Sequence, residues 1–209
     1  MTYQIYQCGK EVTGEMSFDA LQTEAVGIFE SMRAYGGKIH REEEHLDRLL
    51  ESAKTVGYQA CPSRKELIRE LALALRASGG KECYVRLTLW EGHTFVILGR
   101  REHSNEIYAK GVALKTASFP RGGPNTFPWQ VKASVYQQAV LASTEPHPEK
   151  IYDWVFLDTQ HFLTETRVGN LFIVKYAPGN GRGAVTLLTP PEHLILNGVT
   201  RRFVIKCAL

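Results

Sequence analysis

Apolar residues fall into short runs with β-strand propensity at the start of the chain and take helical spacing further on. Residues 3–8 and 25–40 are rich in β-branched and aromatic residues, and Gly36-Gly37 is typical of a hairpin turn. From residue 43 the apolar positions repeat on one helical face as far as Gly57. The sequence therefore predicts a hairpin followed by an amphipathic helix.

A second helix is predicted from Ser63, an N-cap residue with Glu66 three positions later, to Gly79-Gly80. The runs CYVRLTLW and TFVILGR then predict two strands joined by a tight turn at Glu91-Gly92. This part of the chain has the pattern of an α+β unit, an antiparallel sheet with helices on one side.

Residues 118–129 contain three prolines and two glycines, which exclude regular structure and predict a link between two lobes. VKASVYQQAVLAS has helical spacing, and the runs DWVFLD, HFLTET, NLFIVK and AVTLLT predict strands before a final helix in LILNGVTRRFVIKCAL. We expect an N-terminal α+β lobe over residues 1–115 and a β-rich lobe over residues 116–209 that is cut short inside its last helix.

Composition removes several classes of function. The formal net charge of +3 comes from 25 basic and 22 acidic residues without long blocks, which does not resemble a nucleic-acid binder. No apolar run approaches the roughly 20 residues that span a bilayer, and no signal peptide is visible. The four cysteines are far apart and without His clusters, so we expect no metal site and a cytoplasmic location.

Two positions suggest anion binding and amine chemistry. Gly198-Val199-Thr200 leads into a helix whose first N–H groups, with the Thr200 hydroxyl, would face an anion, although many such helix starts bind nothing. Lys132 lies at a loop-to-helix boundary among apolar neighbours, which favours a nucleophilic or basic amine. The ordinary alternative for a lone lysine is a solvated side chain.

Four more residues have a functional and an ordinary interpretation. Glu165 ends a strand before a turn, where it would otherwise pair with Arg167 as an edge carboxylate. Arg48 is on the polar side of the first helix, where a salt bridge with Glu44 is the ordinary account. Tyr84 and Arg86 share one face of a strand, either a carboxylate-binding face or a solvated one.

The order of these residues resembles the class IV aminotransferases, which include branched-chain aminotransferase, D-amino acid aminotransferase and aminodeoxychorismate lyase. The segments that carry the resemblance are FESMRAYGGKIHREEEHLDRLLESAKTVGY, VKASVYQQAVLA, LTETRVGNLFIVK and LLTPPEHLILNGVTRRFVI. They occur in the family's order and at its separations over nearly the whole chain. The resemblance implies an α+β fold-type IV enzyme of two lobes, like D-amino acid aminotransferase, that binds pyridoxal 5′-phosphate and forms a homodimer.

The resemblance also implies roles for the residues of these segments. Lys132 matches the Schiff-base lysine that then moves the substrate proton, and Tyr136 matches a tyrosine near the cofactor ring oxygen. Glu165 matches the partner of the pyridine nitrogen. The phosphate would be held by Arg48, and by the backbone and hydroxyl of the residues Val199 and Thr200.

The strand YVRLTLWEG resembles that of branched-chain enzymes, which implies that Tyr84 and Arg86 bind substrate carboxylates and that Phe29 lines an apolar pocket. The expected reaction is amine transfer between an apolar L-amino acid, such as a branched-chain one, and 2-oxoglutarate. Aminodeoxychorismate lyase is the alternative, since Ser31 stands where lyases have a threonine and Glu24 where branched-chain enzymes have a tyrosine. A shortened, weakly active or inactive family remnant is the third hypothesis.

Overall fold

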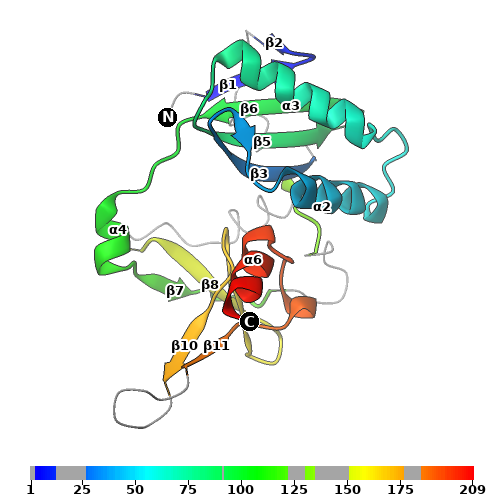
Figure 1. The fold of residues 1–209 in the computed structure, drawn as a ribbon. Helices are drawn as coiled ribbons and strands as arrows, with labels where there is room; N and C mark the ends of the chain where they lie inside the picture. Colours follow the sequence, from blue (N-terminus) through cyan, green and yellow to red (C-terminus); the bar gives the residue numbers. More distant parts are fainter. Residues whose placement is uncertain (1–2, 13–26, 91, 122–129, 135–150, 177–184) are drawn as a thin grey trace. The chain divides into compact units, whose positions relative to one another are not determined.

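The computed structural model describes residues 3–12, 27–90, 92–121, 130–134, 151–176 and 185–209 (Figure 1). The chain divides into two compact units, one of Met1–Asn105 with Val131–Ala139 and the other of Glu106–Gln130 with Val140–Leu209. Compactness does not test which segments fold as domains, so the lobes expected at 1–115 and 116–209 stay a prediction.

The first unit contains an antiparallel sheet with the strand order β2-β1-β6-β5-β3-β4. Its strands are β1 (Tyr3–Gln7), β2 (Lys10–Glu11), β3 (Ile28–Tyr35), β4 (Lys38–Ile39), β5 (Cys83–Trp90) and β6 (His93–Gly99). Gly36 and Gly37 both have positive φ, as the two-residue turn between β3 and β4 requires. The predicted hairpins are confirmed.

Two helices lie against this sheet, as Figure 1 shows: α2 (Glu42–Thr55) and α3 (Arg64–Ser78). The predicted capping box at the start of α3 is present, with the Ser63 and Glu66 side chains and backbones bonded reciprocally. Gly79 ends α3 in the left-handed conformation. The apolar sides of both helices are buried in the core, including Leu46, Leu49, Leu67 and Leu71.

The alternation of side chains along β3 gives the sheet two different faces. Glu30 contacts side chains of α2, so it lies on the face that the helices cover. Its neighbours Phe29 and Ser31 therefore point to the opposite face, where their cross-strand partners on β5 are Thr88 and Arg86. Thr88 and Arg86 thus place polar side chains on this face, which we call the open face because neither α2 nor α3 covers it, although both residues are buried.

The segment that contains Lys132 pairs with the start of β3. The Phe29 N–H donates to the Lys132 carbonyl at 2.9 Å, and Ile28 and Ala133 form an antiparallel bridge. The buried Ser134 hydroxyl accepts from the Gly27 N–H at 2.8 Å and donates to the Gly27 carbonyl at 3.1 Å. These bonds fix the Lys132 backbone beside Phe29.

The second unit contains the parallel pair β7–β8, the antiparallel pair β8–β9 and the hairpin β10–β11. Its elements are α4 (Asn105–Lys110), β7 (Leu114–Thr116), β8 (Asp153–Leu157), β9 (Leu163–Thr166), β10 (Ile173–Tyr176), β11 (Val185–Leu188), the 3-10 helix η1 (Glu192–Leu194) and α6 (Val199–Ala208). The strands β8 to β11 and the final helix confirm the predictions. No helix in the described part of the chain is long and apolar enough to cross a membrane.

Candidate functional site

Phe29, Arg86 and Lys132 form a compact group on the open face of the first unit's sheet. The guanidinium carbon of Arg86 lies 3.7 Å from the centroid of the Phe29 ring, and Lys132 Nζ lies 5.3 Å from the same centroid. Both distances are within the range of cation–π attraction. Three residues that sequence alone assigned to lysine chemistry and substrate binding are therefore brought together around one aromatic ring.

The strand face beside this ring is polar and buried. Arg86 is 2% exposed and Tyr84 is 7% exposed, so the solvated-face interpretation of this pair is wrong. Arg86 Nε donates to Thr88 Oγ1 at 3.3 Å, and the Tyr84 and Ser31 hydroxyls lie 3.1 Å apart. Burial lowers the pKa of Arg86 to about 10, which leaves it cationic at neutral pH. A buried cation and two hydroxyls suit an anionic ligand.

Arg48 makes a different ion pair from the one expected for it. Its Nε donates to Glu30 Oε1 at 2.7 Å and its Nη2 to Glu30 Oε2 at 2.6 Å, so the partner is a buried carboxylate on β3. Glu44, the partner expected from helical spacing, pairs with Arg41 instead. The reason is that the Arg48 side chain, 10% exposed, is directed at the sheet.

Glu30 is an ionised carboxylate in the protein interior. Burial acts to raise its pKa, but hydrogen bonds from His45 and Arg48, and the charges of Arg48 and Lys132, outweigh burial and lower the pKa to about 2. His45 Nδ1 lies 2.7 Å from Glu30 Oε2. Because Glu30 carries no proton, the His45 Nδ1–H must be the donor.

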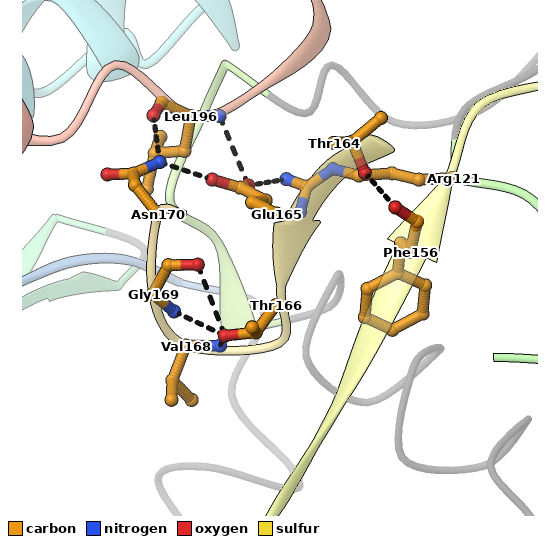
Figure 2. Close-up of polar contacts among 9 residues, drawn as sticks. All are labelled: Arg121, Phe156, Thr164, Glu165, Thr166, Val168, Gly169, Asn170 and Leu196. Carbon is orange, nitrogen blue, oxygen red and sulfur yellow. Dashed lines mark hydrogen bonds and ion pairs between the residues drawn. The ribbon is translucent and has the colours of Figure 1, made fainter. Parts of the chain in front are cut away.

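In the second unit, Glu165 is the centre of a polar network, which Figure 2 shows. Glu165 Oε1 accepts from the Leu196 backbone N–H at 3.1 Å and pairs with the buried Arg121, while Oε2 accepts from Asn170 Nδ2 at 2.6 Å. The expected pairing of Glu165 with Arg167 is wrong, since Arg167 lies near Asp153. Glu165 is 4% exposed, so it is not an edge carboxylate.

The neighbours of Glu165 on β9 fix its direction. Thr164 Oγ1 donates to the Phe156 carbonyl of β8 at 2.9 Å, and Thr166 Oγ1 is bonded to both the N–H and the carbonyl of Gly169 in the turn that follows (Figure 2). Side chains alternate along a strand, so with Thr164 and Thr166 fixed, Glu165 points to the other side of β9.

Asn170 connects this carboxylate to the start of α6. Its Nδ2 also donates to the Leu196 carbonyl at 3.0 Å, and its Oδ1 lies so close to Gly198 that a Cβ on that residue would overlap it. Gly198 is the N-cap of α6. Because glycine has no side chain, no capping side chain of that residue accepts a hydrogen bond from the first N–H groups of the helix, which include those of Val199 and Thr200. An uncapped helix N-terminus of this length is a suitable place for an anion.

Some expected residues lie outside the described part of the chain, and some residues of the site were missed. Tyr136 and Glu24 are outside it. The sequence reasoning did not select four residues of these networks: Glu30, His45, Arg121 and Asn170. A charged residue inside the β-prone run IFESMRAY was a usable signal for Glu30, because an unpaired charge is rarely buried.

The first unit by itself contains an amine, Lys132, and a guanidinium, Arg48, and the second contains a buried carboxylate, Glu165, and the uncapped N-terminus of α6. A phosphorylated, aldehyde-bearing pyridine needs these groups: a cation and backbone N–H groups for the phosphate, a carboxylate for the ring nitrogen and an amine for the aldehyde. Among the described residues, no group of three or more His, Cys, Asp or Glu side chains is arranged to hold a metal ion.

Comparison with known proteins agrees with a site for such a pyridine. Residues 27–209 match the model of the family described as amino-transferase class IV. A protein of Rickettsia felis named a probable branched-chain-amino-acid aminotransferase is 28% identical over 193 residues, which are 87% of this chain and 64% of that protein. The chain therefore spans less than two thirds of the length of this relative.

Solved structures have the same fold. The branched-chain amino acid aminotransferase of Escherichia coli matches with a TM-score of 0.77 and 27% identity, over 98% of this chain and 73% of that one. A T.th. branched-chain amino acid aminotransferase, solved with pyridoxamine 5′-phosphate, matches with a TM-score of 0.75 and 24% identity, over 98% and 72%. The fold is that of the fold-type IV enzymes, and the chain belongs to the class IV aminotransferases.

Proposed function

We propose that the chain is a pyridoxal 5′-phosphate-dependent aminotransferase that moves an amino group between an L-amino acid with an apolar side chain and 2-oxoglutarate. The observation that carries this proposal is the group formed by Lys132, Phe29 and Arg86. It combines an amine with a buried cation around an apolar ring. Family membership and the branched-chain names of the relatives support the same reaction.

Six residues would hold the cofactor. For the phosphate, the first unit offers the Arg48 guanidinium and the second offers the N–H groups of Val199 and Thr200 at the start of α6, and groups of both kinds bind phosphate in general. Glu165 would accept a hydrogen bond from the protonated ring nitrogen. Tyr136, by resemblance, contacts the ring oxygen, and Lys132 supplies the amine that binds the aldehyde.

When bound, pyridoxal 5′-phosphate supplies the electron sink for the pair of electrons left when the substrate α-carbon loses its proton. With the cofactor bound, Lys132 Nζ would be the base that takes this proton and the acid that returns it. Glu165, which Arg121 and Asn170 hold in one orientation, would favour the protonated ring nitrogen as its hydrogen-bond acceptor. In this scheme the residues of the chain stabilise the charges of the cofactor, and Lys132 transfers one proton.

Substrate selection is assigned to the open face of the sheet. Arg86, with the Tyr84 hydroxyl, binds a substrate carboxylate, since a buried guanidinium makes strong charge-assisted hydrogen bonds to carboxylates. Phe29 offers an apolar wall to the substrate side chain. This arrangement favours a substrate with one carboxylate and an apolar side chain on the donor side of the reaction.

The test is spectroscopic and kinetic. The purified chain mixed with pyridoxal 5′-phosphate should develop visible absorbance that borohydride bleaches, and Lys132→Ala should abolish both. Lys110→Ala, which removes an exposed lysine, is the matched control and should behave like the unchanged chain. Amine transfer from leucine to 2-oxoglutarate should accompany the absorbance. A colourless chain that binds no cofactor would support the inactive-remnant hypothesis instead.

Aminodeoxychorismate lyase activity is the second candidate, and the position of Ser31 favours it. The Ser31 hydroxyl lies on the open sheet face within hydrogen-bond distance of Tyr84, where the family's lyases also have a hydroxyl. Release of pyruvate from aminodeoxychorismate without amine transfer from leucine would select this reaction. Ser31→Gly should then reduce pyruvate release and leave cofactor absorbance intact.

The proposal includes a homodimer in the cytoplasm. The cytoplasmic location is supported by the four cysteines, all of which are free thiols, as is usual in a reducing compartment. The homodimer rests on the family resemblance. Light scattering of the purified chain should give twice the monomer mass of 23.5 kDa, and a monomer at micromolar concentration would contradict it.

A further inference from the structure

Glu30 is a buried charged residue with no part in the chemistry proposed above. Its side chain is 1% exposed, and both of its oxygens are used: Oε1 by Arg48 Nε, and Oε2 by Arg48 Nη2 and His45 Nδ1. Burying an ionised carboxylate is costly unless its partners compensate. A residue with this cost and this arrangement of bonds needs an explanation beyond packing.

The geometry of the pair fixes a single orientation of Arg48. Two parallel N–H···O bonds of 2.7 and 2.6 Å join the planar guanidinium to the planar carboxylate, so the two groups share a plane. A free arginine side chain has many rotamers, and ordering it on binding costs free energy. Because Glu30 orders Arg48 beforehand, a ligand of Arg48 does not bear that cost.

His45 fixes the carboxylate in turn. His45 and Arg48 are three residues apart on α2 and therefore lie on the same side of the helix, both directed at Glu30. His45 is 9% exposed, and its Nδ1–H donates to Glu30 at 2.7 Å. The Glu30 carboxylate is thus fixed by hydrogen bonds from two residues of α2, His45 and Arg48, and its backbone is fixed in β3.

We infer that Glu30 is a positioning residue, which with His45 orients the Arg48 guanidinium for the cofactor phosphate. The inference rests on the proposed function, in which Arg48 binds that phosphate. Glu30 touches neither cofactor nor substrate in this scheme. Among ligand affinities, its effect should therefore be confined to ligands that carry the phosphate group, whereas a residue that only supports the fold would affect the affinity for all ligands alike.

The test measures the affinity of the apo chain for pyridoxal 5′-phosphate and for pyridoxal, which lacks the phosphate, by absorbance titration. Glu30→Gln should weaken pyridoxal 5′-phosphate binding at least about tenfold, the effect of losing one charge-assisted hydrogen bond. Pyridoxal binding should change by less than about threefold. Lys132 is close enough to Glu30 to interact with its charge, but a change at Lys132 would affect both ligands equally.

Two further variants make the result specific. Glu44→Gln, which breaks the exposed pair of Arg41 and Glu44 on the same helix, is the matched control and should change neither affinity. In an Arg48→Met background, Glu30→Gln should cause no further loss of pyridoxal 5′-phosphate affinity. If Glu30→Gln does not fold, Glu30→Asp keeps the charge and withdraws it by about 1.5 Å, and the same phosphate-selective loss is expected.

The outcomes separate the inference from the proposed function. Equal weakening of both ligands, or no weakening of either, would overturn the positioning role while cofactor binding by the unchanged chain still stood. Independent, additive effects of Glu30→Gln and Arg48→Met would overturn it as well. If the unchanged chain binds neither ligand, the proposed function itself is wrong and the inference is overturned with it.

Discussion

Gly198 lies where any larger residue would displace Asn170. Its φ of −64° and ψ of 133° suit every L-residue, so alanine introduces no backbone strain. The added Cβ would instead overlap Asn170 Oδ1 and force that side chain away. Asn170 would then lose its bonds to Glu165 Oε2 and to the Leu196 carbonyl.

The two lost bonds set the size of the effect. A hydrogen bond to a charged group contributes about 1.5–3 kcal/mol and a neutral one about 0.5–1.5 kcal/mol. The Gly→Ala change restricts the unfolded chain and returns about 0.4–1 kcal/mol. We expect Gly198→Ala to lower the free energy of unfolding by about 1–4 kcal/mol, which is about 2–4 °C in melting temperature for each kcal/mol.

Urea denaturation followed by the fluorescence of the buried Trp154 measures this loss. Gly169→Ala is the matched control from the same network, because its Cβ would meet only Thr166 Oγ1 at 3.6 Å, and it should change stability by less than about 1 kcal/mol. In an Asn170→Ala background the overlap is gone, so Gly198→Ala should cost nothing more. Additive losses in the double variant would refute the reasoning.

Three further predictions concern the first unit. Because the pKa of Glu30 is lowered from 4.5 to about 2, its stabilising effect is complete above pH 4.5 and is lost as the pH falls toward 2. The free energy of unfolding, measured in urea over that pH range, should therefore fall less steeply in Glu30→Gln than in the unchanged chain. Ser134→Ala leaves the buried Gly27 N–H without its acceptor and should cost about 1–3 kcal/mol, whereas Ser134→Thr, which keeps the hydroxyl, should cost less. Phe29→Leu removes the ring beside Arg86, and a double-mutant cycle with Arg86→Met should show a coupling of about 0.5–2 kcal/mol; zero coupling would contradict the cation–π assignment.

Most of the fold was predictable because its elements carry local signals. The capping box at Ser63, the left-handed Gly79 and the paired Gly36-Gly37 each specify a terminus or turn through neighbouring residues alone. The elements α4 and β7 were not predicted. No residue of α4 is buried and β7 has three residues, so neither shows an amphipathic period.

The site was predictable in its parts and not in its pairings. Spacing and resemblance selected Lys132, Arg48 and Glu165, but helical and strand neighbours suggested Glu44 and Arg167 as partners for the last two. The actual partners, Glu30 and Arg121, are 18 and 44 positions away in the chain. Ion pairs that depend on tertiary folding leave no short-range signal, so sequence favoured the local alternatives.

The bidentate ion pair between Glu30 and Arg48 constrains how this part of the chain can evolve. A substitution of Arg48 alone leaves an uncompensated buried anion, which costs several kcal/mol and exceeds the penalty of changing both residues. Descendants that lose the arginine should therefore first, or soon afterwards, replace the glutamate by a neutral residue. Positions 30 and 48 should covary among relatives more strongly than either does with position 44.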